Sequence, residues 1–155
     1  MKVKDLMIPL SECPHVAEDR SLQAAIIMLS AFRRRLKDSD YPPRFVLVTD
    51  SQYRVVGVLR HLEILRGLAR AAGGGASHAE LIALAPRVTA REAMTVYSES
   101  EHVDASASLE EAVEQMLSGS FRHLLVDEGG TTIGILRLSE VFARICRDIG
   151  RTAKE

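Results

Sequence analysis

The chain contains one nine-residue segment twice, and this repeat constrains the fold more than any other feature. The first copy runs from Val55 to Glu63 and the second from Thr132 to Glu140, with matching glycines, arginines and glutamates 77 residues apart. Each copy is a short apolar run with a glycine inside it, followed by Arg-x-x-Glu at the start of an amphipathic segment. A repeat at this distance indicates a duplicated supersecondary unit. We therefore expect two copies of one strand-to-helix unit.

Composition limits the classes of protein to which the chain can belong. Its 155 residues suffice for one ordinary domain or for two half-domains that share a core. The net charge of −1 provides no overall field that favours nucleic acid or acidic lipid. The mean hydropathy is +0.02, no apolar run approaches the roughly 20 residues that span a bilayer, and the first residues lack a secretory signal. We expect a cytoplasmic protein with no membrane or nucleic-acid partner, whose two distant cysteines are reduced thiols.

Local patterns in the first half predict the order strand, helix, strand, strand, helix. A short strand is expected near residues 15–17, and Ser21 is a candidate N-cap for a helix of about four turns. The β-branched run 45–49 and the run 54–59 are joined by a short polar loop, which predicts a hairpin. Helical spacing then resumes from Glu63 to Ala72. The apolar stripe of the first helix is expected to contain Leu22, Ala25, Ile26, Leu29, Phe32 and Leu36.

Residues 73–87 are predicted to form a linker followed by a short helix at 78–84. The linker begins with three consecutive glycines, which end the preceding helix. A glycine-rich phosphate loop would require a preceding strand and a following Lys-Ser/Thr signature. A predicted helix precedes these glycines and no lysine follows them, so a flexible connection is favoured.

The second half repeats the order of the first. Residues 90–94 match residues 3–7 at a spacing of 87, and each set is expected to form a helical turn. Ser108 and Glu111 form a capping box at the start of the next helix. A second hairpin is predicted at residues 123–136. The predicted boundaries are residues 1–72 for the first repeat, 88–149 for the second and 150–155 for a tail.

The spacing between the two repeats changes along the chain. It falls from 87 residues in the first helix to 77 in the hairpin, which indicates a ten-residue insertion in the first repeat at about 35–44. A folded unit of about 60 residues has only marginal stability on its own, because it buries a smaller share of its surface than a larger domain does. We therefore expect the two repeats to pack face to face about a pseudo-two-fold axis, with equivalent residues opposite each other across a shared cleft.

The ordered set of motifs resembles a tandem pair of CBS (cystathionine-β-synthase-type) domains, also called a Bateman module. Each half has an "hxDhM"-like start, a Ser-Leu-x-x-Ala helix start, a strand of the LLVD type and a Gly-h-h-Arg-x-x-Glu ending. The resemblance covers residues 3–68 and 90–145. It implies an α/β (α+β) fold of two β-α-β-β-α repeats and a regulatory, non-enzymatic module. It also implies that an adenine nucleotide binds in the cleft between the repeats, without a required cofactor, and that the chain forms a flat homodimer.

The ending of each repeat carries the family's nucleotide-binding signature in altered form. In the signature Gly-h-h-Ser/Thr-x-x-Asp, the hydroxyl contacts phosphate or ribose and the carboxylate contacts the ribose hydroxyls. This chain keeps the glycine, lengthens the carboxylate by one methylene and replaces the hydroxyl with a guanidinium. The corresponding residues are Gly57, Arg60 and Glu63 in the first repeat and Gly134, Arg137 and Glu140 in the second.

The two substituted arginines have two explanations that the residues leave open. An arginine near a helix N-terminus is disfavoured by about 0.3–1 kcal/mol unless an anion offsets its charge. In the first explanation, each arginine pairs with its own glutamate at i, i+3. In the second, the anion is a ligand phosphate held by the guanidinium and the helix N-terminus, and the glutamate stays available for ribose.

Four further residues are candidate ligand contacts because of where the resemblance places them. Arg122 and His123 precede the second hairpin, where family members contact the base or phosphates. At a spacing of 77 their counterparts are Phe45 and Val46, and simple surface exposure is the competing explanation.

Thr95 and Ile8 lie in the two segments that line the cleft in the family. A threonine can form hydrogen bonds through its side chain, whereas an isoleucine offers only apolar or backbone contact. This difference favours one well-formed polar pocket over two. The Arg33–Arg35 run is expected either to complement a helix C-terminus or to bind an anionic partner.

The sequence contains no recognisable catalytic or metal-binding arrangement. Its five histidines are scattered without metal-ligand spacing, and no G-x-S-x-G motif occurs. Our leading hypothesis is a stand-alone module that senses AMP, ADP, ATP or a related small anion and acts on a regulated partner protein. The alternative is a dimerisation or protein-interaction module without a ligand.

Overall fold

The computed structural model describes residues 1–153, which form two compact units. Unit 1 consists of Met1–Glu12 and Ser98–Glu155, and unit 2 consists of Cys13–Tyr97. Each unit is a four-stranded sheet with helices, so the predicted α+β class is confirmed. The predicted pseudo-two-fold packing concerns the placement of the units and stays a prediction. The repeat boundaries at residues 72 and 88 also stay a prediction.

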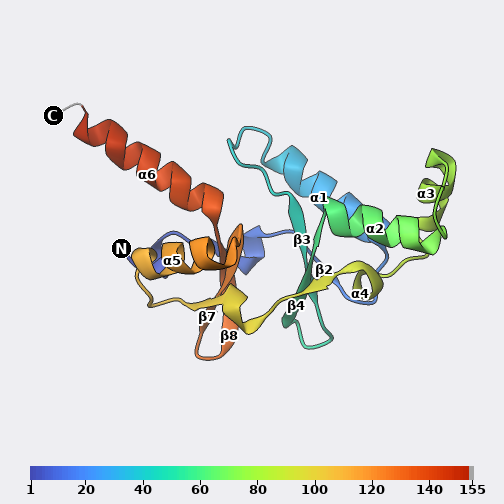
Figure 1. The fold of residues 1–155 in the computed structure, drawn as a ribbon, viewed down its shortest axis with the longest axis horizontal. Coiled ribbons are helices and arrows are strands. Elements are labelled where there is room, and N and C mark those ends of the chain that lie inside the picture. Colours follow the sequence, from blue (N-terminus) through green and yellow to red (C-terminus); the bar gives the residue numbers. More distant parts are fainter. Residues whose placement is uncertain (154–155) are drawn as a thin grey trace. The chain divides into compact units, whose positions relative to one another are not determined.

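Unit 2 contains the first hairpin and its helices (Figure 1). Its sheet has the order β2-β3-β4-β5, in which β2 is parallel to β3 and the other neighbours are antiparallel. Ser21 caps α1 by accepting from the backbone N–H of Ala24, as predicted. The elements are β2 (His15–Ala17), α1 (Leu22–Arg35), β3 (Phe45–Thr49), β4 (Val55–Arg60), α2 (His61–Ala71), α3 (His78–Leu84), α4 (Ala90–Ala93) and β5 (Thr95–Val96).

Unit 1 contains the second hairpin and has the sheet order β1-β8-β7-β6. Strand β6 is parallel to β7, whereas β7–β8 and β8–β1 are antiparallel. The capping box of Ser108 and Glu111 is present at the start of α5. The elements are η1 (Val3–Asp5), β1 (Ile8–Pro9), η2 (Leu10–Glu12), η3 (Glu99–Glu101), β6 (His102–Asp104), α5 (Leu109–Gly119), β7 (His123–Glu128), β8 (Thr131–Arg137) and α6 (Leu138–Thr152).

The segment that leads into each sequence repeat joins the sheet of the other repeat. Strand β5 pairs with β4, where Val96 lies opposite Gly57 and Thr95 opposite Val58. Strand β1 pairs in the same way with β8, where Pro9 lies opposite Gly134. We call residues 3–9 and 90–96 the lead-in segments. Their exchange, which the sequence did not predict, makes unit 2 one continuous stretch of chain.

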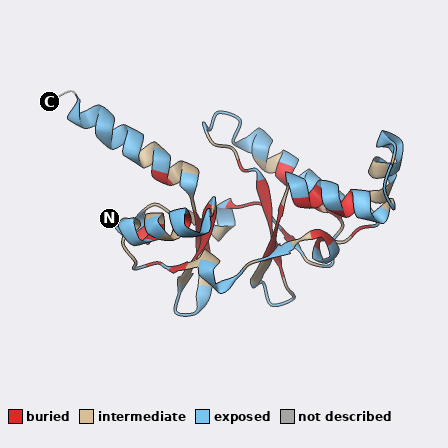
Figure 2. Cartoon of the chain, viewed as in Figure 1, coloured by how far each residue is buried: buried red, intermediate tan, exposed pale blue. Residues whose placement is uncertain are grey.

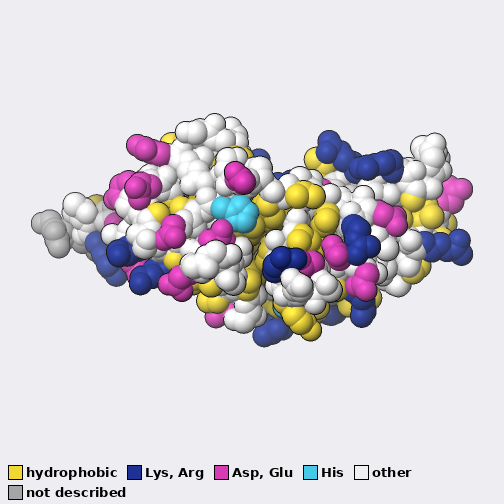
Figure 3. All heavy atoms as spheres, turned by 90° about the horizontal axis from the view of Figure 1, so that it is seen from below, with side chains coloured by type: hydrophobic (Ala, Val, Ile, Leu, Met, Phe, Trp, Pro, Cys, Tyr) yellow, Lys and Arg dark blue, Asp and Glu magenta, His cyan; other side chains and the backbone are white. Residues whose placement is uncertain are grey.

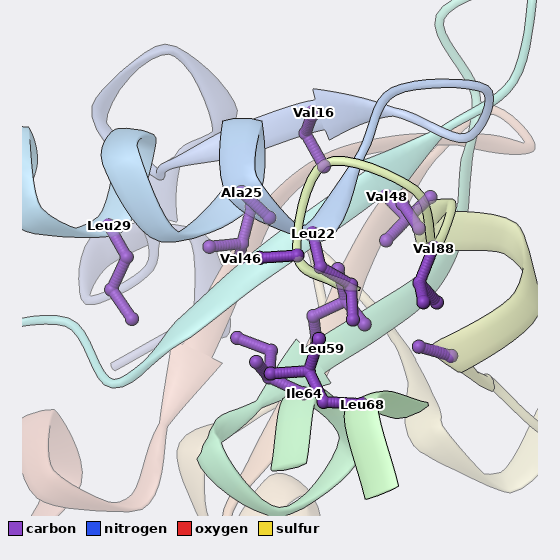
Figure 4. Packing of buried hydrophobic residues seen from close by; sticks show 13 residues of the cluster. Val16, Leu22, Ala25, Leu29, Val46, Val48, Leu59, Ile64, Leu68 and Val88 are labelled. Carbon is purple, nitrogen blue, oxygen red and sulfur yellow. The ribbon is translucent and has the colours of Figure 1, made fainter. Parts of the chain in front are cut away.

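Each unit encloses its own apolar core. In unit 2, side chains of α1, β3, β4 and α2 point toward one another, as the labelled residues of Figure 4 show. This core also takes in Val88, Ala90 and Ala93, which precede or belong to the lead-in segment of the second repeat. The core of unit 1 likewise takes in Val3, which is fully buried. Each sequence repeat therefore completes its core with residues from the other repeat.

The apolar stripe predicted for a helix is wider than the face of that helix that is buried in the structure. Leu22, Ala25 and Leu29 of α1 are buried, whereas Ile26 and Leu36 are exposed because only a narrow face of the helix meets the sheet. Helix α6 is the extreme case: Val141 is its buried residue, and most of the helix is exposed in Figure 2. This helix continues to Thr152, into the predicted tail, whose last two residues lie outside the described part of the chain.

The glycine-rich stretch forms a connection between α2 and α3. Gly73, Gly74 and Gly75 all have positive φ, and nothing lies within 4 Å of a Cβ built on any of them.

Side chains of both charge signs are spread over the face shown in Figure 3, in keeping with the net charge of −1. Within residues 1–153, none of the helices combines the length and apolar character needed to cross a membrane.

Candidate functional site

The duplicated segment forms a strand-to-helix junction in each unit. Strand β4 ends at Arg60 and α2 begins at His61; strand β8 ends at Arg137 and α6 begins at Leu138. Both arginines are helix N-caps with extended backbone. Each guanidinium is thus attached at a helix N-terminus, where the helix dipole favours an anion.

The junction of unit 2 is a closed hydrogen-bond network around Glu63. Its carboxylate accepts from the backbone N–H of Arg60 at 2.9 Å and from the Arg60 Nε at 3.0 Å. A terminal nitrogen of Arg60 donates to Glu63 Oε1 at 2.5 Å, and the Thr95 hydroxyl donates to the same oxygen at 3.1 Å. The Glu63 side chain is only 6% exposed. Of the two explanations for a substituted arginine, Arg60 therefore shows the paired arrangement.

The network keeps Glu63 ionised despite its burial. Burial by itself would raise the pKa of the Glu63 carboxyl, because the charged form loses contact with water. Hydrogen bonds from the side chain and backbone of Arg60 outweigh this effect and hold the pKa below its ordinary value of 4.5. The buried carboxylate thus depends on Arg60 for its charged form.

The junction of unit 1 has the same residues in a less complete arrangement. Arg137 contacts Glu140 through one terminal nitrogen, and α6 has no capping box. The side chain of Arg137 is 14% exposed, compared with 43% for Arg60. Its Nε is buried and is the one such side-chain atom without a hydrogen-bond partner among residues 1–153. An unpaired buried donor costs about 1–3 kcal/mol, so this nitrogen is unusual in a folded protein.

Arg122 and His123 lie at this same junction. His123 is opposite Arg137 in the β7–β8 ladder and is buried, whereas Arg122 is exposed. The carbonyl of Arg122 accepts from the backbone N–H of Leu138 at 2.8 Å, which links the start of β7 to the start of α6. The structure therefore brings Arg122, His123, Arg137 and Glu140 together within unit 1.

The counterparts assigned to Arg122 and His123 from the spacing of 77 were wrong by one residue. Phe45 lies opposite Arg60 as His123 lies opposite Arg137, so Phe45 corresponds to His123 and Arg44 to Arg122. The first hairpin strands are 78 residues apart and the second strands 77. One of the ten inserted residues therefore lies in the turn of the first hairpin, and the other nine precede β3.

The predicted glycines leave space for the lead-in strands. A Cβ on Gly134 would lie 2.5 Å from the carbonyl oxygen of Ile8, and one on Gly57 would lie 2.9 Å from that of Thr95. The Sδ atom of Met94 would be 2.6 Å from the same Cβ of Gly57. The absence of a side chain thus serves the close approach of two strands. A direct ligand contact at either glycine stays a prediction.

The difference between Thr95 and Ile8 is the sequence signal that separates the two junctions. Thr95 completes the hydrogen bonding of Glu63 in unit 2. Ile8 holds the equivalent position in unit 1 and has no hydroxyl to donate to Glu140. The sequence predicted one polar pocket from this pair but did not reveal that Arg137 would keep an unpaired buried nitrogen. Among residues 1–153, no group of three or more His, Cys, Asp or Glu side chains is placed to hold a metal ion.

Comparisons with known proteins agree with this architecture. A family model described as the CBS domain matches residues 80–147. No curated protein matches the chain. The structure of CBSX2 in complex with AMP is 24% identical, with a TM-score of 0.64, and the match covers 94% of this chain and 96% of that one.

Two other solved structures have the same fold. The CBS-domain containing protein ATU1752 from Agrobacterium tumefaciens is 25% identical with a TM-score of 0.64, over 92% of this chain and 91% of that one. The cytosolic domain of the Mg2+ channel MgtE in complex with ATP is 24% identical with a TM-score of 0.61, over 92% of this chain and 48% of that one. Residues 80–147 therefore match the CBS domain, and the fold of the whole chain is that of solved CBS-domain proteins, consistent with a tandem CBS pair.

Proposed function

We propose that the chain is a regulatory CBS-pair module that binds an adenosine-containing nucleotide and signals through a change in conformation or dimerisation. The observation that carries the proposal is the duplicated Gly-x-x-Arg-x-x-Glu junction, which places a guanidinium and a carboxylate beside a helix N-terminus. Similar solved structures bound to AMP and to ATP support the choice of ligand class.

The chemistry of such a junction suits the phosphate and the ribose of a nucleotide. A guanidinium binds phosphate through two parallel N–H···O bonds, and the helix dipole favours the same negative charge. A glutamate carboxylate can accept hydrogen bonds from ribose hydroxyls. A nucleotide that binds one arrangement of the module more tightly shifts the population toward that arrangement. A regulatory role therefore requires no catalytic residue, and we propose that the chain is not an enzyme.

The remaining parts of the proposal rest on the family resemblance and composition. We propose a homodimer that acts on a partner protein in the cytoplasm. A second candidate function, a dimerisation or protein-interaction module without a ligand, is favoured by one observation. The closed network of Arg60, Glu63 and Thr95 satisfies its charges without any ligand.

A thermal-unfolding screen of the full chain with AMP, ADP and ATP tests the proposal. A ligand at a hundred times its dissociation constant adds about 2.7 kcal/mol to the free energy of unfolding. For a chain of this size, that corresponds to a rise in Tm of about 5–10 °C. Adenosine and inorganic phosphate at matched ionic strength are the controls. An unchanged Tm with all three nucleotides at millimolar concentration would contradict nucleotide sensing and favour the ligand-free module.

A further inference from the structure

The two junctions share one sequence pattern but differ in how many of their hydrogen bonds are formed. In unit 2, both Nε and a terminal nitrogen of Arg60 donate to Glu63, which also accepts from the Arg60 backbone and from Thr95. In unit 1, Arg137 reaches Glu140 through one terminal nitrogen, and its Nε is buried without a partner. The duplication provides an internal comparison, because the same arginine and glutamate meet two different surroundings.

This difference decides which arginine a phosphate would engage. The Nε of Arg60 already donates to a carboxylate that is 94% buried, so a phosphate that took this nitrogen would leave the carboxylate with fewer donors. A phosphate oxygen that reaches Arg137 Nε supplies an acceptor to a donor that has none. The first exchange loses existing hydrogen bonds, whereas the second adds one.

The cause of the difference lies in the exchanged lead-in segments. Thr95 of β5 donates to Glu63 and fixes the carboxylate against Arg60. Ile8 of β1 occupies the equivalent position beside β8 and has no polar side-chain atom. Glu140 is accordingly more exposed, at 27%, than Glu63.

Resting on the proposed nucleotide binding, we propose that the chain binds one nucleotide, whose phosphate is held by Arg137 in unit 1. In this assignment, Arg60, Glu63 and Thr95 form a structural clasp that binds no ligand. The module is therefore asymmetric, with one sensing junction and one structural junction built from the same motif. Phosphate-bearing ligands are recognised at Arg137, and adenosine lacks the group that this arginine requires.

Arginine Nε–Hε resonances of the unmodified full chain test the assignment directly. Addition of AMP is expected to shift the Arg137 Nε–Hε resonance strongly, because a new acceptor reaches that nitrogen, and to leave the Arg60 resonance in place. Adenosine is expected to move neither resonance. Assignment comes from Arg137→Lys and Arg60→Lys, each of which removes one signal. A shift of the Arg60 resonance, or of both, would overturn the assignment.

Calorimetry with matched variants provides the second readout. We expect one AMP per chain, with Arg137→Gln weakening AMP binding at least about tenfold because it removes a charge-assisted contact. Arg60→Gln is expected to lower Tm while changing the AMP dissociation constant less than about twofold. Two AMP per chain, or a tenfold loss confined to Arg60→Gln, would overturn the assignment while leaving nucleotide binding intact. If AMP, ADP and ATP all fail to bind the unmodified chain, the proposed function fails and this inference fails with it.

Discussion

At the scale of single residues, Glu63 is a buried carboxylate held by hydrogen bonds from two different segments of the chain. The longer glutamate reaches back to the N-cap backbone and side chain of Arg60 while also accepting from Thr95. Its pKa is lowered by these donors against the opposing effect of burial. A carboxyl with a lowered pKa stabilises the fold fully above its ordinary value of 4.5. That contribution is lost as the pH falls through the lower value of the folded protein.

Glu63→Gln is expected to lower the free energy of unfolding at pH 7 and to flatten its dependence on pH below about 4.5. The amide keeps the size of the side chain but loses the charge that Arg60 stabilises. We expect a loss of about 1–2 kcal/mol at pH 7, since Arg60 is partly exposed to solvent. Urea unfolding at several pH values between 7 and 3, monitored by circular dichroism, measures this free energy of unfolding. The control is Asp40→Asn, on an exposed loop of unit 2, which should leave the pH dependence of the free energy of unfolding unchanged. If Glu63→Gln also gave the pH dependence of the unmodified chain, the pairing of Glu63 with Arg60 would be refuted.

At the scale of elements, the sequence predicted helices and hairpin strands well because their patterns are periodic. The Ser21 cap, the Ser108 capping box and both hairpins occur as predicted. Periodicity identifies an element but not its partner, so the exchange of β1 and β5, each two residues long, was not predictable. The extra residue in the first hairpin turn was hidden for a similar reason, because both hairpins have the same apolar pattern.

The candidate site was predicted to the level of residue type but not of pairing. The positions of Arg60 and Arg137 at strand-to-helix junctions follow from the repeat itself. Which arginine is fully paired depends on Thr95 or Ile8, which reach each junction through a strand from the other repeat. Such a contact is set by tertiary structure, and the local sequence around each arginine does not contain it.

Gly134→Ala is expected to weaken the attachment of β1 and destabilise unit 1. The added Cβ would lie 2.5 Å from the carbonyl oxygen of Ile8, and backbone cannot move aside as a flexible side chain can. Overpacking of this kind typically costs about 1–3 kcal/mol. Gly150→Ala is the matched control, because nothing lies within 4 Å of its Cβ and alanine favours helix α6 by about 1 kcal/mol. Urea unfolding that finds Gly134→Ala as stable as the unmodified chain would contradict the close approach.

At the scale of the whole molecule, unit 2 is one continuous stretch inserted into the chain of unit 1. Residues 13–97 supply all of unit 2, whereas unit 1 needs residues from both sides of that stretch. Within unit 1, the backbone N–H groups of Val3 and Lys4 donate to the carbonyls of Ala107 and Ala105. Val3 is also fully buried in the core. The first segment is thus an integral part of unit 1.

A fragment of residues 13–97 is expected to fold alone, whereas residues 98–153 should fold only when a peptide of residues 1–12 is added. The first fragment retains its entire core, and the second lacks Val3 and strand β1. Circular dichroism and amide-proton dispersion of each fragment, with and without the peptide, measure the outcome. A peptide with Val3→Asp is the control and should fail to restore structure. Folding of residues 98–153 without any peptide would contradict the role of the first segment.

Because unit 2 is inserted into the sequence of unit 1, the connectivity of the chain also determines which unit a stretching force acts on first. A pull applied between residues 1 and 153 acts on two points of unit 1 and passes through its β1–β8 pairing. Unit 2 lies between residues 13 and 97, both of which are attached to unit 1, so it carries no load while unit 1 holds. Unit 2 is therefore not loaded until residues 1–12 have separated from the rest of unit 1, and the clasp around Glu63 carries no load before that point.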